Sequence, residues 1–358
     1  MGTSSITSLT TEYKSKYNTY KELDRIVFDK LSNMVSENHF FIMDLTHRLK
    51  SFDSLKEKLI KKNGKYENIY DLTDLCGFRI VCYFSDTVDE IASAISKIFD
   101  VDYANSIDKR NSLEDTQFGY LSLHYICSLK GYEGYSTELT SIRFEIQIRT
   151  VLQHAWAEIE HDLGYKSEFG VPGKIRREFS RIASLLEVAD EQFVGLRKST
   201  KDYTQDVREK ISAGVIDDIP LDQLTLSEYM EHNISFNRVV ADFSAQLNIS
   251  VINSDTSRYV VQLHYLEIRT LGDLIKVFRA NKQMLIDFIA EKVNLYELET
   301  VTTSMILRYL CRAELIRSNY SEEKILSFMK LTYSEKKAQK NAQKVIEASK
   351  MFKSTVHQ

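Results

Sequence analysis

The chain has 358 residues, of which 43% are hydrophobic and 27% are charged, and its formal net charge is −4. Because single domains cluster near ~100–200 residues, this length favours two domains, each with a core of its own. The slightly acidic balance argues against a general nucleic-acid-binding protein, although local basic patches leave tRNA open as a partner.

Apolar residues near the start of the chain recur at helical spacing and predict helices before the first strand. They are Tyr13, Tyr17, Tyr20, Ile26, Val27, Leu31 and Met34. In the segment that follows, Arg48 and Lys50 lie on one side of an extended lead-in, and Ser51 or Ser54 caps the next helix. Ser54 and Lys58 share a face of that helix. A helix N-terminus among hydroxyls and cations suits phosphate binding, whereas this segment alone also fits a lysine-rich surface helix.

Two segments then alternate polar and apolar residues, which predicts strands with one polar and one apolar face. In residues 74–82, Asp74 precedes Gly77, where we expect the chain to bend into the strand, and Arg79 lies on the polar side. In residues 118–127, the polar side carries Tyr120, Ser122 and His124.

Residues 143–150 give the strictest alternation, with Arg143, Glu145, Gln147 and Arg149 on one face and three apolar residues on the other. If the three strands share one sheet with their polar faces aligned, two carboxylates meet several cations and one stacking ring. This combination describes a metal-dependent nucleotide site. The residues that we expect to converge are Asp74, Arg79, Tyr120, His124, Glu145, Gln147 and Arg149.

Helical spacing resumes over residues 178–200, where we expect the apolar stripe to pack on a core. The stripe consists of Phe179, Ile182, Leu185, Leu186, Ala189, Phe193 and Leu196. A short segment that ends at Pro220 then marks our preferred boundary between two domains, 1–212 and 213–358. The first domain is expected to have an α+β fold, in which a mixed β-sheet is flanked by helices.

The second domain reads as mostly helical and carries no catalytic constellation. Its helices are predicted at 226–243, 271–278, 284–298, 302–316 and 322–331, while 259–266 fits a strand or a helix edge. The last segment carries several lysines on a predicted helix. A solvated helix face is the favoured interpretation, and an RNA-contacting or self-inhibiting tail is the alternative.

The four cysteines have no metal-ligand spacing, and three lie in apolar strand contexts, so we expect buried free thiols. The N-terminus lacks a signal pattern, and no run of ~18 apolar residues occurs. We therefore expect a cytoplasmic protein with no membrane partner.

Four motifs, taken in order, resemble those of the RelA/SpoT-type (p)ppGpp (alarmone) synthetases, especially small synthetase-only members, here with a C-terminal extension. Arg48, Lys50, Ser54 and Lys58 resemble the ATP-binding signature, and residues 74–81 the first metal motif. Residues 119–124 are similar to the acceptor-base motif. Residues 145–150 are similar to the second metal motif, and the match continues into residues 154–166.

The resemblance implies transfer of the β,γ-pyrophosphate of ATP to the ribose 3′-hydroxyl of GDP or GTP, which yields (p)ppGpp and AMP. Asp74 and Glu145 would hold Mg²⁺, and Glu145 would orient or deprotonate the attacking hydroxyl. Tyr120 would stack on the acceptor base. The residues that would grip ATP are Arg48, Lys50, Ser54, Lys58 and Arg79, and those that would steady the acceptor are His124, Gln147 and Arg149.

The sequence departs from the family pattern just before Gly119, where Thr116, Gln117 and Phe118 replace a basic residue, a proline and an asparagine. This departure keeps open a toxin-like enzyme that pyrophosphorylates the 3′ end of tRNA, with the C-terminal half as inhibitor or sensor. A non-enzymatic nucleotide-binding module is a third alternative. A homo-oligomer and a regulator of the C-terminal domain are also left open as partners. Residues 161–162 resemble a hydrolase His-Asp pair, but no histidine set supports hydrolase activity.

Overall fold

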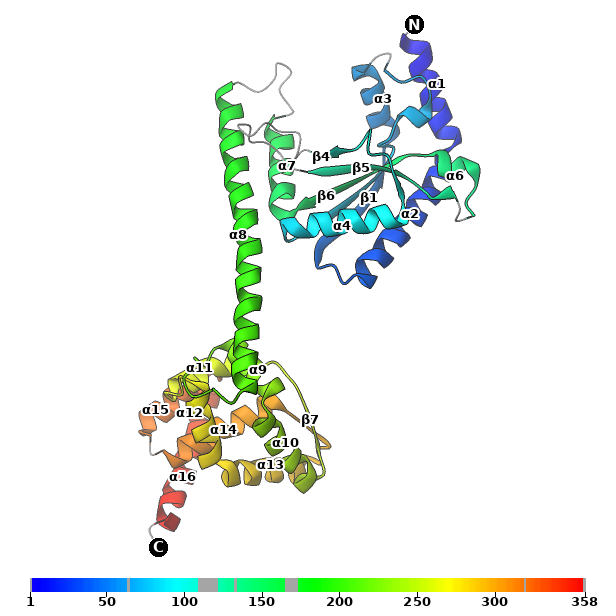
Figure 1. Ribbon diagram of the computed structural model, residues 1–358. Coiled ribbons are helices and arrows are strands. Elements are labelled where there is room, and N and C mark those ends of the chain that lie inside the picture. Colours follow the sequence, from blue (N-terminus) through cyan, green and yellow to red (C-terminus); the bar gives the residue numbers. More distant parts are fainter. Residues whose placement is uncertain are drawn as a thin grey trace. The chain divides into compact units, whose positions relative to one another are not determined.

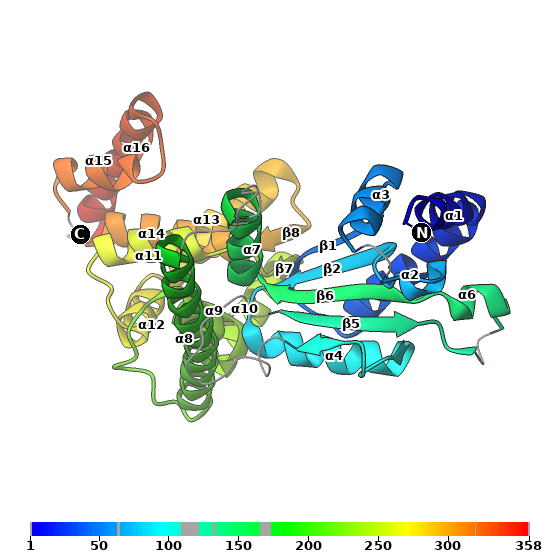
Figure 2. The same ribbon diagram turned by 90° about the horizontal axis from the view of Figure 1, so that it is seen from above.

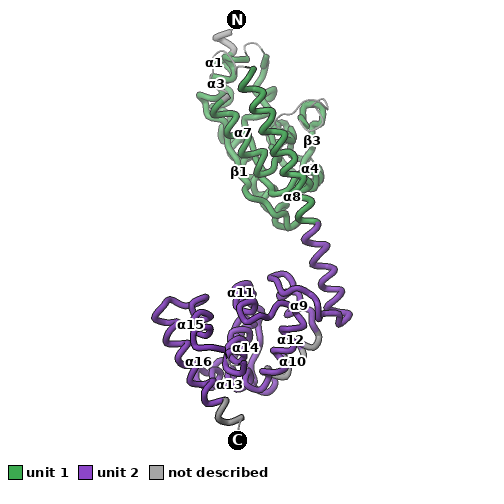
Figure 3. The backbone as a smooth tube through the Cα atoms, turned by 90° about the vertical axis from the view of Figure 1, so that its left-hand side faces the viewer, with its two compact units in different colours: residues 1–198 green, residues 199–358 purple. Residues whose placement is uncertain are grey.

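The computed structural model describes residues 2–62, 65–108, 122–131, 134–164, 173–318 and 320–356. It divides into two compact units, residues 1–198 and 199–358, which Figure 3 shows in different colours. The division falls within one long helix, α8 (Gly173–Ser212), and so comes before the boundary predicted after residue 212, which stays a prediction. The separate functions assigned to the two domains remain predictions.

The first unit is built on one mixed β-sheet (Figure 1). Among the strands of this sheet that the structure describes, only β2 and β6 pair in parallel, and the other neighbours are antiparallel. The order is β1 (Ile42–Leu49), β2 (Cys76–Cys82), β6 (Phe144–Thr150), β5 (Leu123–Ser128) and β3 (Asp100–Val101), with β4 (Ile107–Asp108) also paired to β5. The α+β class and the mixed sheet are thereby confirmed.

One face of this sheet is apolar and carries the core. Its buried side chains are Phe78, Ile80 and Cys82 of β2, Phe144, Ile146 and Ile148 of β6, and Leu123 and Cys127 of β5. Two amphipathic helices, α2 (Tyr17–Glu37) and α4 (Ser85–Ile98), cover this face with residues such as Leu23, Val27, Ile91 and Ile95. Helix α7 (Val151–Gly164) lies on the other side of the sheet from α4, as Figure 2 shows.

Shorter helical elements complete the unit at its N-terminal end and beside the sheet. They are α1 (Gly2–Ser15), α3 (Phe52–Lys61), η1 (Ile69–Asp71) and α6 (Thr137–Ser141). The predicted helices before the first strand are therefore present as α1 and α2. Their apolar stripes are buried, since Tyr13, Tyr20 and Leu31 are almost fully enclosed.

The predicted helix over residues 178–200 is present within α8, but the prediction that its apolar stripe packs on a core is wrong for four members. Ile182, Leu185, Phe193 and Leu196 are between 46% and 70% exposed. Helical spacing identifies an apolar face but does not say what covers it.

The second unit is mostly helical, as predicted, and has its own core. Residues 259–266, which fitted a strand or a helix edge, belong largely to helix α11, and the segment predicted at 226–243 forms two helices. Asn233 ends the first of these and caps the second by accepting a hydrogen bond from the Phe236 amide at 2.8 Å. The helices are α9 (Gln223–His232), α10 (Ile234–Leu247), α11 (Ser257–Tyr265), α12 (Leu271–Ala280), α13 (Lys282–Tyr296), α14 (Thr303–Arg317), α15 (Glu322–Lys330) and α16 (Glu335–Val356).

A small parallel pair, β7 (Ser250–Ile252) and β8 (Thr300–Thr302), was not predicted in this unit. The cysteine prediction is confirmed, because all four are free and buried. Burial raises the pKa of the Cys82 and Cys311 thiols to about 12, so both stay protonated. Within the described residues, no helix has the length and apolar character needed to cross a membrane.

Candidate active site

The strand register brings the predicted polar residues onto one face of the sheet. Gly77 of β2 pairs with Glu145 of β6 and, on its other side, with Arg48 of β1. Gln147 pairs with Arg79 across the β2–β6 ladder and with His124 across the β5–β6 ladder. Directly paired residues point to the same face. The parallel β2–β6 pair therefore places side chains from distant segments side by side.

A pocket of about 160 Å³ opens on this polar face. Its lining includes Arg48, Asp74, Arg79, Glu145 and Gln147. Both predicted metal-binding carboxylates thus face one pocket, together with cations from β1 and β2.

Gly77 also lines this pocket, and its role differs from the predicted one. The residue lies inside β2 and pairs on both sides, so the chain does not bend there. A Cβ atom built at Gly77 would meet nothing within 4 Å. The missing side chain therefore keeps space open between Arg48 and Glu145.

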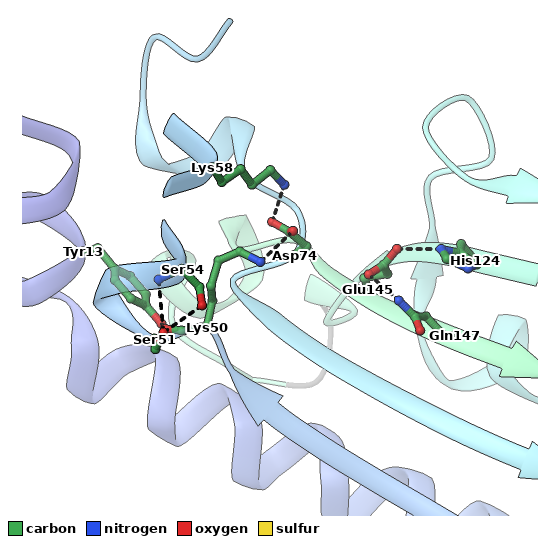
Figure 4. A network of polar contacts seen from close by, with 9 residues as sticks. All are labelled: Tyr13, Lys50, Ser51, Ser54, Lys58, Asp74, His124, Glu145 and Gln147. Atoms are coloured by element: carbon green, nitrogen blue, oxygen red, sulfur yellow. Dashed lines mark hydrogen bonds and ion pairs between the residues drawn. The ribbon is translucent and has the colours of Figure 1, made fainter. Parts of the chain in front are cut away.

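Asp74 lies in the turn before β2 and is held by two lysines (Figure 4). Lys50 Nζ is 3.0 Å from one carboxylate oxygen, and Lys58 Nζ is 2.7 Å from the other. Burial by itself would raise the pKa of the Asp74 carboxyl. The hydrogen bond from Lys58 and the charges of both lysines outweigh that effect and leave the pKa below its ordinary value. Asp74 is therefore ionised at neutral pH.

The helix that carries Lys58 is fixed at its start by Ser51. The Ser51 hydroxyl accepts a hydrogen bond from the Ser54 amide at 3.1 Å and lies 2.9 Å from the Ser54 hydroxyl. This decides between the two predicted caps. The Tyr13 hydroxyl, in turn, donates to the Lys50 carbonyl at 2.9 Å. The lead-in, the cap and Lys58 thus present cations and hydroxyls beside Asp74, as Figure 4 shows.

Glu145 is held by a different set of partners. His124 Nδ1 lies 2.8 Å from one carboxylate oxygen, and the Gln147 amide donates to the other at 3.0 Å. Arg149 donates in turn to the Gln147 carbonyl oxygen. Burial would raise the pKa of Glu145, and the negative charge of Asp74 acts in the same direction. The His124 and Gln147 hydrogen bonds, with the His124 charge, still lower the pKa overall.

A second pocket, of about 310 Å³, continues from the first towards helix α7. Arg79 and Arg149 line it together with Glu158 and His161 of α7. Arg79 donates to Glu158 at 3.0 Å. Sequence reasoning did not identify this ion pair, although Glu158 lies one helical turn after His154, which lies 3.6 Å from it. The four-residue spacing of His154 and Glu158 shows in the sequence that both lie on one face of α7, but it does not indicate Arg79 as a partner.

Among the predicted site residues, Tyr120 lies outside the described residues. All of the others lie on the polar face, in the turn before it or on the lead-in and helix beside it. In the structure, His124 contacts the carboxylate of Glu145. The prediction had assigned His124 to binding the acceptor nucleotide. The assignment of these residues to ATP, metal or acceptor remains a prediction.

The two carboxylates also bear on whether the site fits Mg²⁺. Among the described residues, no group of three or more His, Cys, Asp or Glu side chains could hold a metal ion. Mg²⁺ commonly takes only one or two carboxylates and completes its shell with waters and substrate phosphates. Asp74 and Glu145 are both ionised, face one pocket and repel each other, so a shared cation between them would be favourable. The residues present fit such an ion.

Residues 47–169 match the family model described as the region found in RelA/SpoT proteins. Over 162 residues the chain is 31% identical to GTP pyrophosphokinase YjbM of Bacillus subtilis (strain 168), covering 45% of this chain and 74% of that protein. The chain belongs to the RelA/SpoT family. GTP pyrophosphokinase YwaC of the same organism is 28% identical over 154 residues, which is 42% of this chain and 71% of that protein. These matches confirm the predicted membership in a family of pyrophosphokinase-type enzymes.

Among solved structures, small alarmone synthetase 2 from Bacillus subtilis is similar to this RelA/SpoT chain, with 27% identity and a TM-score of 0.45. The match covers 52% of this chain and 99% of that chain. A GTP pyrophosphokinase family protein from Streptococcus pneumoniae matches with 26% identity and a TM-score of 0.45, over 54% of this chain and 96% of that one.

Proposed function

We propose that this chain transfers the β,γ-pyrophosphate of ATP to the ribose 3′-hydroxyl of GDP or GTP, producing (p)ppGpp and AMP in a Mg²⁺-dependent reaction. The observation that carries this proposal is that two carboxylates, Asp74 and Glu145, line one pocket together with Arg48 and Arg79. The pKa of each carboxyl is lowered, which favours the ionised form. The names of the curated relatives, both GTP pyrophosphokinases, support the substrate class.

Phosphoryl and pyrophosphoryl transfer ask the protein mainly for positioning and charge neutralisation. Lys50 and Lys58, already placed beside Asp74, would contact the phosphates of ATP together with Arg48 and Arg79. The N-terminus of α3, where Ser54 lies, adds backbone amides that favour an anion. A Mg²⁺ ion held by Asp74 and Glu145 would neutralise charge on the phosphates.

Glu145 would orient the attacking hydroxyl and accept its proton. The hydrogen bonds from His124 and Gln147 keep the carboxylate ionised and fix its direction. Because the pKa of Glu145 is lowered, its ionised form is available throughout the neutral range, although a lowered pKa also makes it a weaker base. Tyr120 would stack on the acceptor base, and Gln147 and Arg149 would steady the acceptor.

Incubation with ATP labelled on its γ-phosphate, together with GDP, GTP or deacylated tRNA, tests the proposal. We expect label on the guanine nucleotide and release of AMP. Glu145→Gln should reduce turnover by at least about 10²–10⁴-fold, because it removes the charge and the proton acceptor but keeps the shape. Its melting curve should stay close to that of the wild type. Near wild-type activity of Glu145→Gln would end the assignment.

A second candidate acceptor is the 3′ end of tRNA. The observation that favours it is the sequence before Gly119, where Thr116, Gln117 and Phe118 stand in place of a basic residue, a proline and an asparagine. The loss of the basic residue removes a phosphate-binding group expected for a guanine nucleotide. Label on tRNA and none on GDP or GTP would select this reaction, with the C-terminal half as inhibitor or sensor. Label on no acceptor, with nucleotide binding intact, would select a non-enzymatic module.

A further inference from the structure

The second unit contains a pocket of its own, of about 130 Å³, that the proposed reaction does not use. Its lining residues come from α11, α14 and α15, three helices that Figure 1 labels, and from the turn after α15. Phe328 of α15, which is buried, contributes an apolar side chain to its lining. Three arginines also line the pocket, namely Arg258, Arg308 and Arg312.

The charged side chains of this pocket are all positive. No carboxylate occurs among its described lining residues, and the neutral polar side chains that line it all carry a hydrogen-bond donor. A lining of this composition favours an anion over a cation or an apolar ligand.

The three guanidinium groups are held by neutral partners. Arg258 donates to the Tyr259 hydroxyl at 3.1 Å, and Arg308 donates to the Tyr333 hydroxyl at 2.7 Å. Arg312 donates at 2.9 Å to the side-chain oxygen of Asn341, which does not line the pocket. These contacts orient the arginines without neutralising their charges.

Other arginines of the same unit are neutralised by carboxylates. Arg208 pairs with Glu228 at 2.9 Å, and Arg317 pairs with Glu314 at 3.0 Å. Across the described part of the chain, no such ion pair joins any of the three pocket arginines to an Asp or Glu side chain. Arg258 and Arg308 line the pocket beside Tyr259, and the charges of both lower the pKa of its hydroxyl against the larger effect of burial. Like charges gathered in one pocket repel each other, although solvent screens the exposed Arg258 and Arg308 and the Asp255 carboxylate also acts on Arg258. A bound anion would remove the repulsion that is left.

We propose that this pocket binds the phosphate end of a small phosphorylated ligand, such as a diphosphate group, free or attached to a nucleoside. Guanidinium groups pair with phosphate oxygens through two parallel hydrogen bonds, and three of them match the charge of a diphosphate. The volume lies below the roughly 300–1,000 Å³ of sites that enclose a whole drug-sized ligand. The pocket therefore suits the phosphate groups, with any nucleoside outside it.

Calorimetric titration of the full chain with sodium pyrophosphate tests the proposal. We expect saturable binding that weakens about tenfold or more in Arg308→Ala and in Arg312→Ala, because each loses a charge-assisted contact. Arg308→Lys should fall between the wild type and Arg308→Ala, because lysine keeps the charge but loses the paired hydrogen bonds. Arg269→Ala, which removes an arginine of the same unit that does not line the pocket, should bind like the wild type.

The candidate active site also faces phosphates, so the same titrations are repeated in a Lys50→Ala background. Binding that still depends on Arg308 there assigns it to the second unit, whatever the fate of the synthetase reaction. A parallel series with GDP and with AMP asks whether an attached nucleoside is tolerated.

Identical pyrophosphate isotherms for the wild type, Arg308→Ala and Arg312→Ala would overturn the proposal, provided that all three melt alike. A second overturning result would be unchanged pyrophosphate binding with weakened binding of a single-stranded RNA oligonucleotide. In that case the arginines would serve a nucleic-acid backbone and not a small ligand.

Discussion

The hydrogen bond between His124 and Glu145 offers a sharp test of how the candidate active site works. His124 Nδ1 lies 2.8 Å from the carboxylate, and the two side chains are only 16% and 19% exposed, so solvent screens the contact weakly. Replacing the imidazole by leucine removes a hydrogen bond to a charged group, which contributes about 1.5–3 kcal/mol. If that contribution is expressed in the transition state, kcat falls roughly 10- to 100-fold. Gln147 still donates at 3.0 Å, so the loss should not be complete.

The pH dependence gives a second readout for His124→Leu. His124 lowers the pKa of Glu145, so without it burial and the charge of Asp74 would raise that pKa. As the pH is lowered, Glu145 of the variant would become protonated at a higher pH than in the wild type, so the acid limb of the activity profile would move to higher pH. Raising the pH would restore part of the lost activity. The assay is a pH profile of kcat with labelled ATP. His124→Asn is the matched control, because its amide can donate to the same oxygen. A profile and a rate like those of the wild type in His124→Leu would refute the reasoning.

Three further changes test other parts of the structure. Lys58→Ala removes a 2.7 Å partner of Asp74 and should raise the KM for ATP about tenfold, with a smaller effect on kcat in steady-state assays. Gly77→Val fills the pocket where a Cβ meets nothing within 4 Å, so it should abolish nucleotide binding in titrations while the melting temperature changes little. Asp190 is buried, which raises its pKa, so it favours the fold while protonated and loses that stabilisation as the pH rises above its ordinary value of 3.8. Asp190→Asn, which can still accept the hydrogen bond from Thr150, should therefore be more stable than the wild type in urea melts at pH 8, but not at pH 4.

Alternation along single strands is enough to identify the polar face of the site. Arg79, His124 and Gln147 lie on three different strands, each at a position that alternation assigns to the polar face. The structure places all three on that face. What alternation could not give was the register between strands. The parallel β2–β6 ladder, which sets Gly77 opposite Glu145, joins segments almost 70 residues apart and depends on tertiary packing.

Helical spacing had a similar limit. It predicted α8 correctly as a helix, yet Leu185 of its apolar stripe is 70% exposed. In α11 the buried residues are Tyr259, Gln262 and Leu263, a helical spacing that includes a polar residue, whereas the apolar Val261 is 59% exposed. Local pattern gives a period and a face, but only packing of distant elements decides which face is buried.

The two lysines beside Asp74 bear on how the proposed site, which contains two carboxylates, would accept a negatively charged substrate. Without them, burial would raise the pKa of Asp74 and favour its protonation. With Lys50 and Lys58 at 3.0 and 2.7 Å, the carboxylate stays ionised before ATP arrives. An ammonium group has three donors, so each lysine can keep one on Asp74 and turn others to a phosphate. In the proposed reaction, Asp74 would therefore orient both lysines towards the phosphates as well as offer a ligand to Mg²⁺. A neutral substitute such as Asp74→Asn would loosen both lysines even though it preserves the shape of the pocket.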